Sequence, residues 1–175
     1  MGASKERLDA LLEVLHRELP GFSLRYKDED RLQRLIGRLV WPFNRHYMTV
    51  YTTVMLGRVY LPSRIFAEAL GPDATYILLR HEAVHLRDAR RFPVLFQLSY
   101  VLCLPVGFTM RAVWEWRGYV ETLRAHHEVF GDVPEALLDA IAERFTGPDY
   151  LYMAVGRERI RRKLEAVRRL ILPAA

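Results

Sequence analysis

The sequence His81-Glu82-Ala83-Val84-His85 places two histidines four residues apart, with a glutamate directly after the first. On an α-helix, residues i and i+4 lie on one face, about 6 Å apart along the axis. Both imidazoles can therefore bind one Zn²⁺ at roughly 2.0–2.1 Å. The Glu82 carboxylate, one position round the helix, can reach a zinc-bound water, which makes it a candidate general base.

The residues around this motif favour a largely buried helix. Gly71-Pro72-Asp73 supplies a break and an N-terminal cap. One face then carries residues at helical spacing, namely Ala74, Ile77, Leu78, His81, His85 and Asp88. Chance alone gives such a motif in on the order of one per cent of chains like this one, and a histidine pair can also be hydrogen-bonded core. The cap and a candidate third ligand favour the metal site.

Length and composition predict one compact domain over residues 1–175. The chain has 175 residues, of which 51% are apolar, so it can bury one sizeable core. Its net charge of +5 resides in one segment, since residues 157–169 hold seven basic and two acidic residues. The body of the chain is neutral, so no nucleic-acid partner is expected.

A cytoplasmic location is expected, with peripheral attachment to a membrane as an alternative. The single cysteine, Cys103, cannot form an internal disulfide, which favours a reducing compartment. Residues 1–19 are too highly charged for the core of a signal peptide. Residues 92–110 carry no charge, but Pro105 and Gly107 interrupt them, and a single span would separate the histidines from any later ligand. A buried core helix is favoured over a helix on the membrane surface.

Hydrophobic periodicity predicts an α+β fold, a small zincin-like domain that is mostly helical, with a short antiparallel sheet packed on the active-site helix. The helices are expected near residues 8–19, 30–40, 63–70, 73–88, 110–130 and 134–145, with a basic C-terminal helix at about 155–172. Strands are expected at 22–26, 47–54 and 59–61, the last two as a hairpin that turns near Gly57. Such a hairpin could bind extended substrate backbone, or it could simply cover the core.

The third metal ligand is sought between Met110 and Phe130. This segment offers Glu115, Glu121, His126, His127 and Glu128. Glu115 and Glu121 differ by about 240° round a helix, so they cannot both face one metal. Glu115 shares its face with Gly118, and a glycine there would let this helix approach the zinc helix closely. Glu115 is the preferred ligand, and Glu121 is the alternative.

The pattern His81-Glu82-x-x-His85 followed by Glu115-x-x-Gly118-Tyr119 resembles the gluzincin metallopeptidases. It is most similar to the soluble minigluzincins and to the catalytic domains of the integral-membrane CAAX-prenyl and heat-shock proteases. The resemblance implies that Glu115 completes the zinc site and that the protein hydrolyses peptide bonds.

The chain departs from the Glu-x-x-Ala-Asp pattern of those families, because Gly118 and Tyr119 stand at its last two positions. In those families the aspartate orients a zinc-ligand histidine. Asp88 lies one turn after His85 on the same face and could take over this role, although a solvated Asp88 is an equal alternative.

The sequence thus predicts a zinc peptidase that acts on a peptide or protein substrate. An additional donor must steady the oxyanion, and His126, Tyr119, Tyr150 and Tyr152 are the candidates. One alternative is a latent zinc-binding interaction module, and another is a metal-free helical protein that associates with membranes through residues 92–110. The basic C-terminal helix is expected to dock on the domain, with an anionic membrane or an acidic partner as alternatives.

Overall fold

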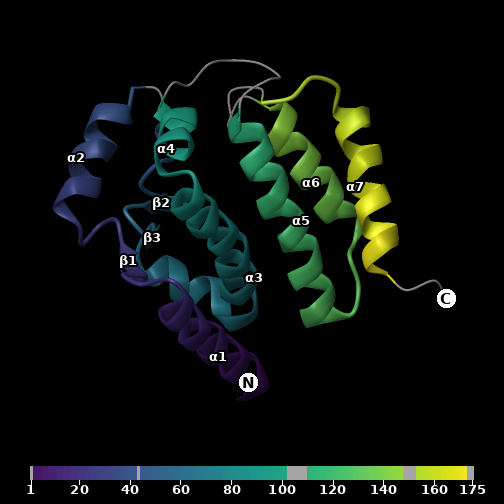
Figure 1. Cartoon of the computed structure of the whole chain (residues 1–175), viewed down its shortest axis with the longest axis horizontal. Coiled ribbons are helices and arrows are strands. Elements are labelled where there is room, and N and C mark those ends of the chain that lie inside the picture. The colour runs from purple at the N-terminus through teal and green to yellow at the C-terminus, as the bar shows by residue number, and fades with distance from the viewer. Residues whose placement is uncertain (1, 43, 102–109, 148–152, 173–175) are drawn as a thin grey trace. The chain divides into compact units, whose positions relative to one another are not determined.

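The computed structural model describes residues 2–42, 44–101, 110–147 and 153–172. The chain divides into two compact units, Met1–Leu86 and Arg87–Ala175, and helix α3 runs across the division (Figure 1). The fold class is confirmed, because the described residues are mostly helical and contain one small sheet. A single domain over 1–175 stays a prediction.

The first unit contains three helices and all three described strands. In chain order these are α1 (Gly2–Glu18), β1 (Ser23–Tyr26), α2 (Arg31–Val40), β2 (Thr53–Met55), β3 (Arg58–Leu61) and most of α3 (Arg64–Arg91). The predicted helices at 8–19 and 30–40 correspond to α1 and α2. Asp30 caps α2, since its carboxylate accepts from the backbone N–H of Gln33 at 3.0 Å.

The sheet has the order β1-β3-β2 and is mixed. Strands β2 and β3 form the expected antiparallel hairpin, and its turn residues Leu56 and Gly57 both have positive φ, at 51° and 75°. The expected strand at 47–54 is wrong in its first part, because β2 begins only at Thr53 and residues 47–50 form turns. Strand β1 pairs with β3 in parallel, so the expectation of an antiparallel sheet holds for one pair only. The reason is the connection, because a parallel pair needs a crossover, and here α2 and residues 41–52 provide it.

Helix α3 carries the two histidines and forms much of the core of the first unit. Gly71 interrupts it with φ 75° and ψ 171°, immediately before Pro72, where the sequence predicted a break. After this kink the helix packs against α1 and the sheet. The buried cluster comprises Leu15, Leu19, Phe22, Val59, Leu79, Ala83 and Leu86. The sheet therefore packs on the motif helix, as expected.

The second unit is helical. It contains the end of α3, α4 (Pro93–Val101), α5 (Met110–Phe130), α6 (Glu135–Thr146) and α7 (Arg157–Ile171). Its core joins α5, α6 and α7 through Tyr119, Leu123, Val133, Leu138, Ile141, Ala142, Phe145, Met153, Ile160 and Leu164. The predicted boundaries of the 110–130 helix agree with α5.

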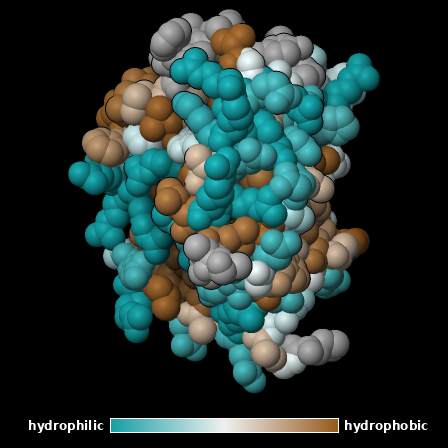
Figure 2. Space-filling model, turned by 90° about the vertical axis from the view of Figure 1, so that its right-hand side faces the viewer, coloured by the Kyte–Doolittle hydropathy of each residue, from teal (hydrophilic) through white to brown (hydrophobic). Residues whose placement is uncertain are grey.

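The basic helix α7 docks on this core through its apolar stripe. Ile160 and Leu164 are buried, and Arg161 forms ion pairs with Asp139, Glu135 and Glu165. Hydrophilic side chains cover much of the side that carries α7 (Figure 2). Docking is thus confirmed for this helix, and acidic residues of α6 and α7 offset part of its positive charge.

Helix α4 covers only the first part of the uncharged stretch. Phe96 is buried, whereas Val94, Leu95 and Leu98 are exposed, so the core expectation holds for one face of this helix. None of the helices in the described part of the chain is both long and apolar enough to cross a bilayer. Cys103, Tyr150 and Tyr152 lie outside the described residues.

Candidate metal centre

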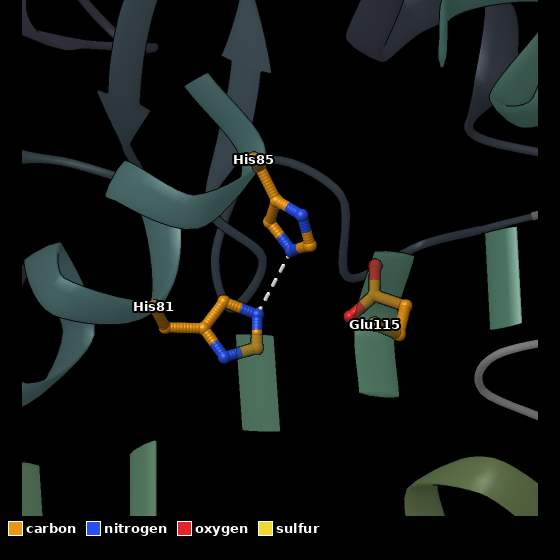
Figure 3. Close-up of side chains that lie close together, drawn as sticks. All are labelled: His81, His85 and Glu115. Carbon is orange, nitrogen blue, oxygen red and sulfur yellow. Dashed lines mark hydrogen bonds between the residues drawn. The ribbon is translucent and has the colours of Figure 1, made fainter. Parts of the chain in front are cut away.

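His81 and His85 lie on successive turns of α3, and both side chains are buried. Their Nε2 atoms are 3.0 Å apart, and the two rings meet edge to face with their centroids 4.8 Å apart. The rings leave the same helix and face one another (Figure 3). The sequence predicted this pairing from the i, i+4 spacing.

Glu115 of α5 completes a buried group of three side chains. One ligand atom each from His81, His85 and Glu115 lies within 4.8 Å of the others, and this group could hold a metal ion. The Glu115 carboxylate comes from a different ribbon than the two histidines (Figure 3). Glu121, the alternative ligand, instead lies 3.4 Å from Arg124 as an ion pair on the same helix.

The donor set fits a zinc ion in chemistry and in spacing. Two imidazole nitrogens and one carboxylate oxygen are typical of zinc sites that keep an open position. Two nitrogens bound at 2.0–2.1 Å in a tetrahedral arrangement are about 3.3 Å apart, close to the 3.0 Å between His81 Nε2 and His85 Nε2. One ligand atom of each of the three residues lies within 4.8 Å of the others, so the group could hold a metal ion.

Glu82, the predicted general base, is buried directly after the first histidine. It lies within electrostatic range of Lys27, a fully buried lysine in the same unit. Burial lowers the pKa of Lys27 to about 7, and the nearby Glu82 opposes this shift. The attraction between the two charges is mutual, so Lys27 favours the carboxylate form of Glu82, which a general base requires.

Contacts with Tyr47 hold the side chain of Lys27 in the first unit. Its Nζ donates to the carbonyl oxygen of Tyr47 at 2.7 Å and lies 3.7 Å from the centroid of the Tyr47 ring. The Tyr47 hydroxyl in turn donates to Gln33 Oε1 at 2.7 Å. Sequence reasoning missed Lys27, because it precedes Asp28-Glu29-Asp30, and a lysine beside an acidic run is typical of a solvated turn.

Asp88 is buried and binds an arginine. Its Oδ1 lies 2.7 Å from Nη1 of Arg117 on α5, while Oδ2 has no hydrogen-bond partner among the described residues. Burial raises the pKa of Asp88, and the charges of Arg117 and Arg91 oppose that rise. The predicted role of orienting a histidine stays a prediction, and the observed contact is an ion pair between α3 and α5.

The predicted oxyanion donors lie in two different environments. Tyr119 is buried in the core of the second unit, with its ring 5.5 Å from that of Phe145. His126 lies eleven residues after Glu115, which is about 16 Å along the helix axis. Its Nδ1 is 2.8 Å from the backbone oxygen of Asp132. Their catalytic roles stay predictions, and the position of His126 on α5 does not favour one for it.

Comparisons with known proteins found no relative of this chain. No protein-family model, no curated protein and no solved structure matches the chain. What the structure adds to the motif is a buried group of His81, His85 and Glu115 that could hold a metal ion.

Proposed function

We propose that this protein is a zinc-dependent peptidase in which His81, His85 and Glu115 bind one Zn²⁺ and Glu82 acts as general base. The observation that carries the proposal is the buried group of three ligands, with a buried glutamate next in sequence to the first. Structural zinc sites usually have four protein ligands, whereas the three that the described residues supply would leave a position for water or substrate.

The chemistry divides between the ion and the protein. Bound Zn²⁺ would polarise the scissile carbonyl and lower the pKa of the attacking water. Glu82 takes a proton from that water at its carboxylate and later delivers it to the nitrogen of the leaving amine. When Lys27 is protonated, its charge favours the ionised form of the nearby Glu82 carboxylate.

Substrate backbone has a candidate binding edge on the sheet. Strand β2 is an edge strand, because the order is β1-β3-β2. An extended peptide could add to such an edge through main-chain hydrogen bonds, with side-chain pockets setting its preference. This mode fits an enzyme that cleaves extended or unfolded segments.

A turnover assay with matched variants tests the proposal. Zinc-loaded wild-type protein is incubated with a peptide mixture, and the products are identified by mass spectrometry. Glu82→Gln should retain zinc and lose activity by about 10²–10⁴-fold, the usual contribution of a general base. Glu68→Gln, an exposed glutamate on the same helix, is the control and should remain fully active.

Two outcomes would contradict the proposal in different ways. Full activity of Glu82→Gln would remove this residue from its role. Zinc bound stoichiometrically by wild-type protein that cleaves no peptide in the mixture would favour the latent interaction module instead.

A further inference from the structure

Helix α2 turns its apolar side toward solvent. Leu32, Leu35 and Leu39 are 47%, 52% and 68% exposed, while Gln33 and Gly37 are the buried residues of this helix. Most surface helices of globular proteins do the reverse and bury their leucines. The three leucines occupy one stripe, since they lie within about 60° of one another round the helix.

The inverted orientation follows from the contacts on the buried side. Gln33 is held by the Tyr47 hydroxyl at 2.7 Å. Gly37 packs so closely on Met48 that an added Cβ would lie 2.5 Å from the Met48 sulfur. These contacts fix the rotation of α2, so the leucines face outward because the opposite side is occupied.

Basic residues flank the leucine stripe. Arg31, Arg34 and Arg38 are exposed on the adjacent side of α2, and the helix has no acidic residue. Trp41, 56% exposed, follows the helix, and the Arg45 guanidinium lies 5.0 Å from its ring centroid. A leucine stripe with arginines beside it is the composition of helices that lie in a membrane interface.

We propose that the leucine stripe of α2 and its neighbouring arginines form a docking surface for an anionic lipid membrane. The leucines enter the boundary between headgroups and acyl chains, and the arginines contact lipid phosphates while their aliphatic stems cover apolar surface. Charge favours this occupant over a second copy of the chain, because pairing two α2 helices would bring two sets of three arginines together. The surface is independent of the proposed peptidase activity.

Vesicle sedimentation with the full chain tests the proposal. Wild-type protein should sediment with phosphatidylglycerol–phosphatidylcholine vesicles at low salt, and far less at high salt or with phosphatidylcholine alone. Replacing Leu32, Leu35 and Leu39 by serine should abolish binding and lower the thermal midpoint only slightly, because these side chains are 47–68% exposed. The double substitution Arg34→Gln with Arg38→Gln should weaken binding about 25-fold, or about five-fold for each arginine.

Matched controls separate this surface from general charge and hydrophobicity. Ile65→Ser with Leu170→Ser removes two side chains that are more than three-quarters exposed, and Arg159→Gln with Arg162→Gln removes the same charge from exposed positions of α7. Neither pair should change sedimentation. The proposal is overturned if wild-type protein stays in solution, if the controls weaken binding equally, or if light scattering shows a dimer that the leucine substitutions dissociate.

Discussion

The Nε2 atoms of His81 and His85 lie 3.0 Å apart on successive turns of α3. Without a metal, one ring must donate an N–H to the other at this distance. With a metal, both nitrogens turn their lone pairs to the ion, and Glu115 supplies the negative charge. An ion held by these three side chains should therefore stabilise the fold.

Zinc should therefore raise the stability of the wild-type protein. Free zinc at 100 times its dissociation constant adds about 2.7 kcal/mol to the free energy of unfolding. For a chain of this length that is roughly 5–10 °C in thermal midpoint. Metal content and thermal midpoint are measured together. His85→Ala and Glu115→Ala should lose both the metal and the shift, while Glu121→Ala should keep both.

Other results would revise the site. Zinc kept in Glu115→Ala and lost in Glu121→Ala would transfer the third ligand to the alternative residue. Wild-type protein that takes up no metal after reconstitution would remove the metal site altogether.

The ion pair between Asp88 and Arg117 should stabilise the protein, chiefly near neutral pH. Arg117→Gln removes the ion-pair partner of a buried carboxylate, which should cost about 1–3 kcal/mol of unfolding free energy, since Arg117 is half exposed and Arg91 still acts on Asp88. The pKa of Asp88 is already raised by burial, so the folded state binds its proton more tightly than the unfolded state does. The contribution of Asp88 to the free energy of unfolding therefore falls as pH rises from about 4 through that pKa. Arg117→Gln should lose most unfolding free energy above that pKa, where Asp88 is ionised.

Urea unfolding at pH 4 and pH 7 measures this effect. Adding Asp88→Asn to Arg117→Gln should recover part of the loss at pH 7, because a neutral amide needs no counter-charge. A loss of equal size at both pH values, unchanged in the double variant, would show that Arg117 contributes by packing alone.

Lys27 should make stability depend on pH in the alkaline range. Its pKa is lowered to about 7 in the folded protein, against an ordinary value of 10.5, because burial disfavours the ammonium. Between these values the unfolded chain binds the additional proton, so stability rises with pH, by up to about 1.4 kcal/mol per pH unit. Below pH 7 the protein carries the full cost of the buried charge.

Lys27→Met tests this prediction, because it keeps the length of the side chain and removes the charge. The variant should exceed wild type in unfolding free energy by the largest amount below pH 7, and this difference should shrink as pH rises toward 10. Lys5→Met, at an exposed position, is the control and should follow wild type at every pH. A constant difference between Lys27→Met and wild type would contradict the lowered pKa.

The elements that the sequence predicts well are those set by local signals. The 110–130 helix begins and ends as expected, and the break before Asp73 occurs at Gly71. The hairpin turn at Leu56-Gly57 also follows from residue type. Pairing of β1 with β3 could not be read in this way, because it depends on contacts between residues more than thirty positions apart.

The same distinction applies to the candidate site. The i, i+4 spacing predicts that His81 and His85 meet, and the glycine at position 118 favours Glu115 over Glu121, which agrees with the group in the structure. The roles of Lys27 and Arg117 could not be predicted, because the sequence around an isolated basic residue does not indicate whether it is buried or which residue it contacts. The outward-facing leucines of α2 are a related case, since Leu32 and Leu39 have the periodicity of a core face.

The docking of α7 predicts unequal effects for two leucines of that helix. Leu164 is fully buried in the core of the second unit, whereas Leu170 is 88% exposed. Leu164→Ala should lower the unfolding free energy by about 2–5 kcal/mol through lost burial and a residual cavity. Leu170→Ala should change it by less than about 0.5 kcal/mol. Urea unfolding of both variants checks this, and small changes in both would mean that α7 leaves the core in solution and that its basic side is available to a membrane or an acidic partner.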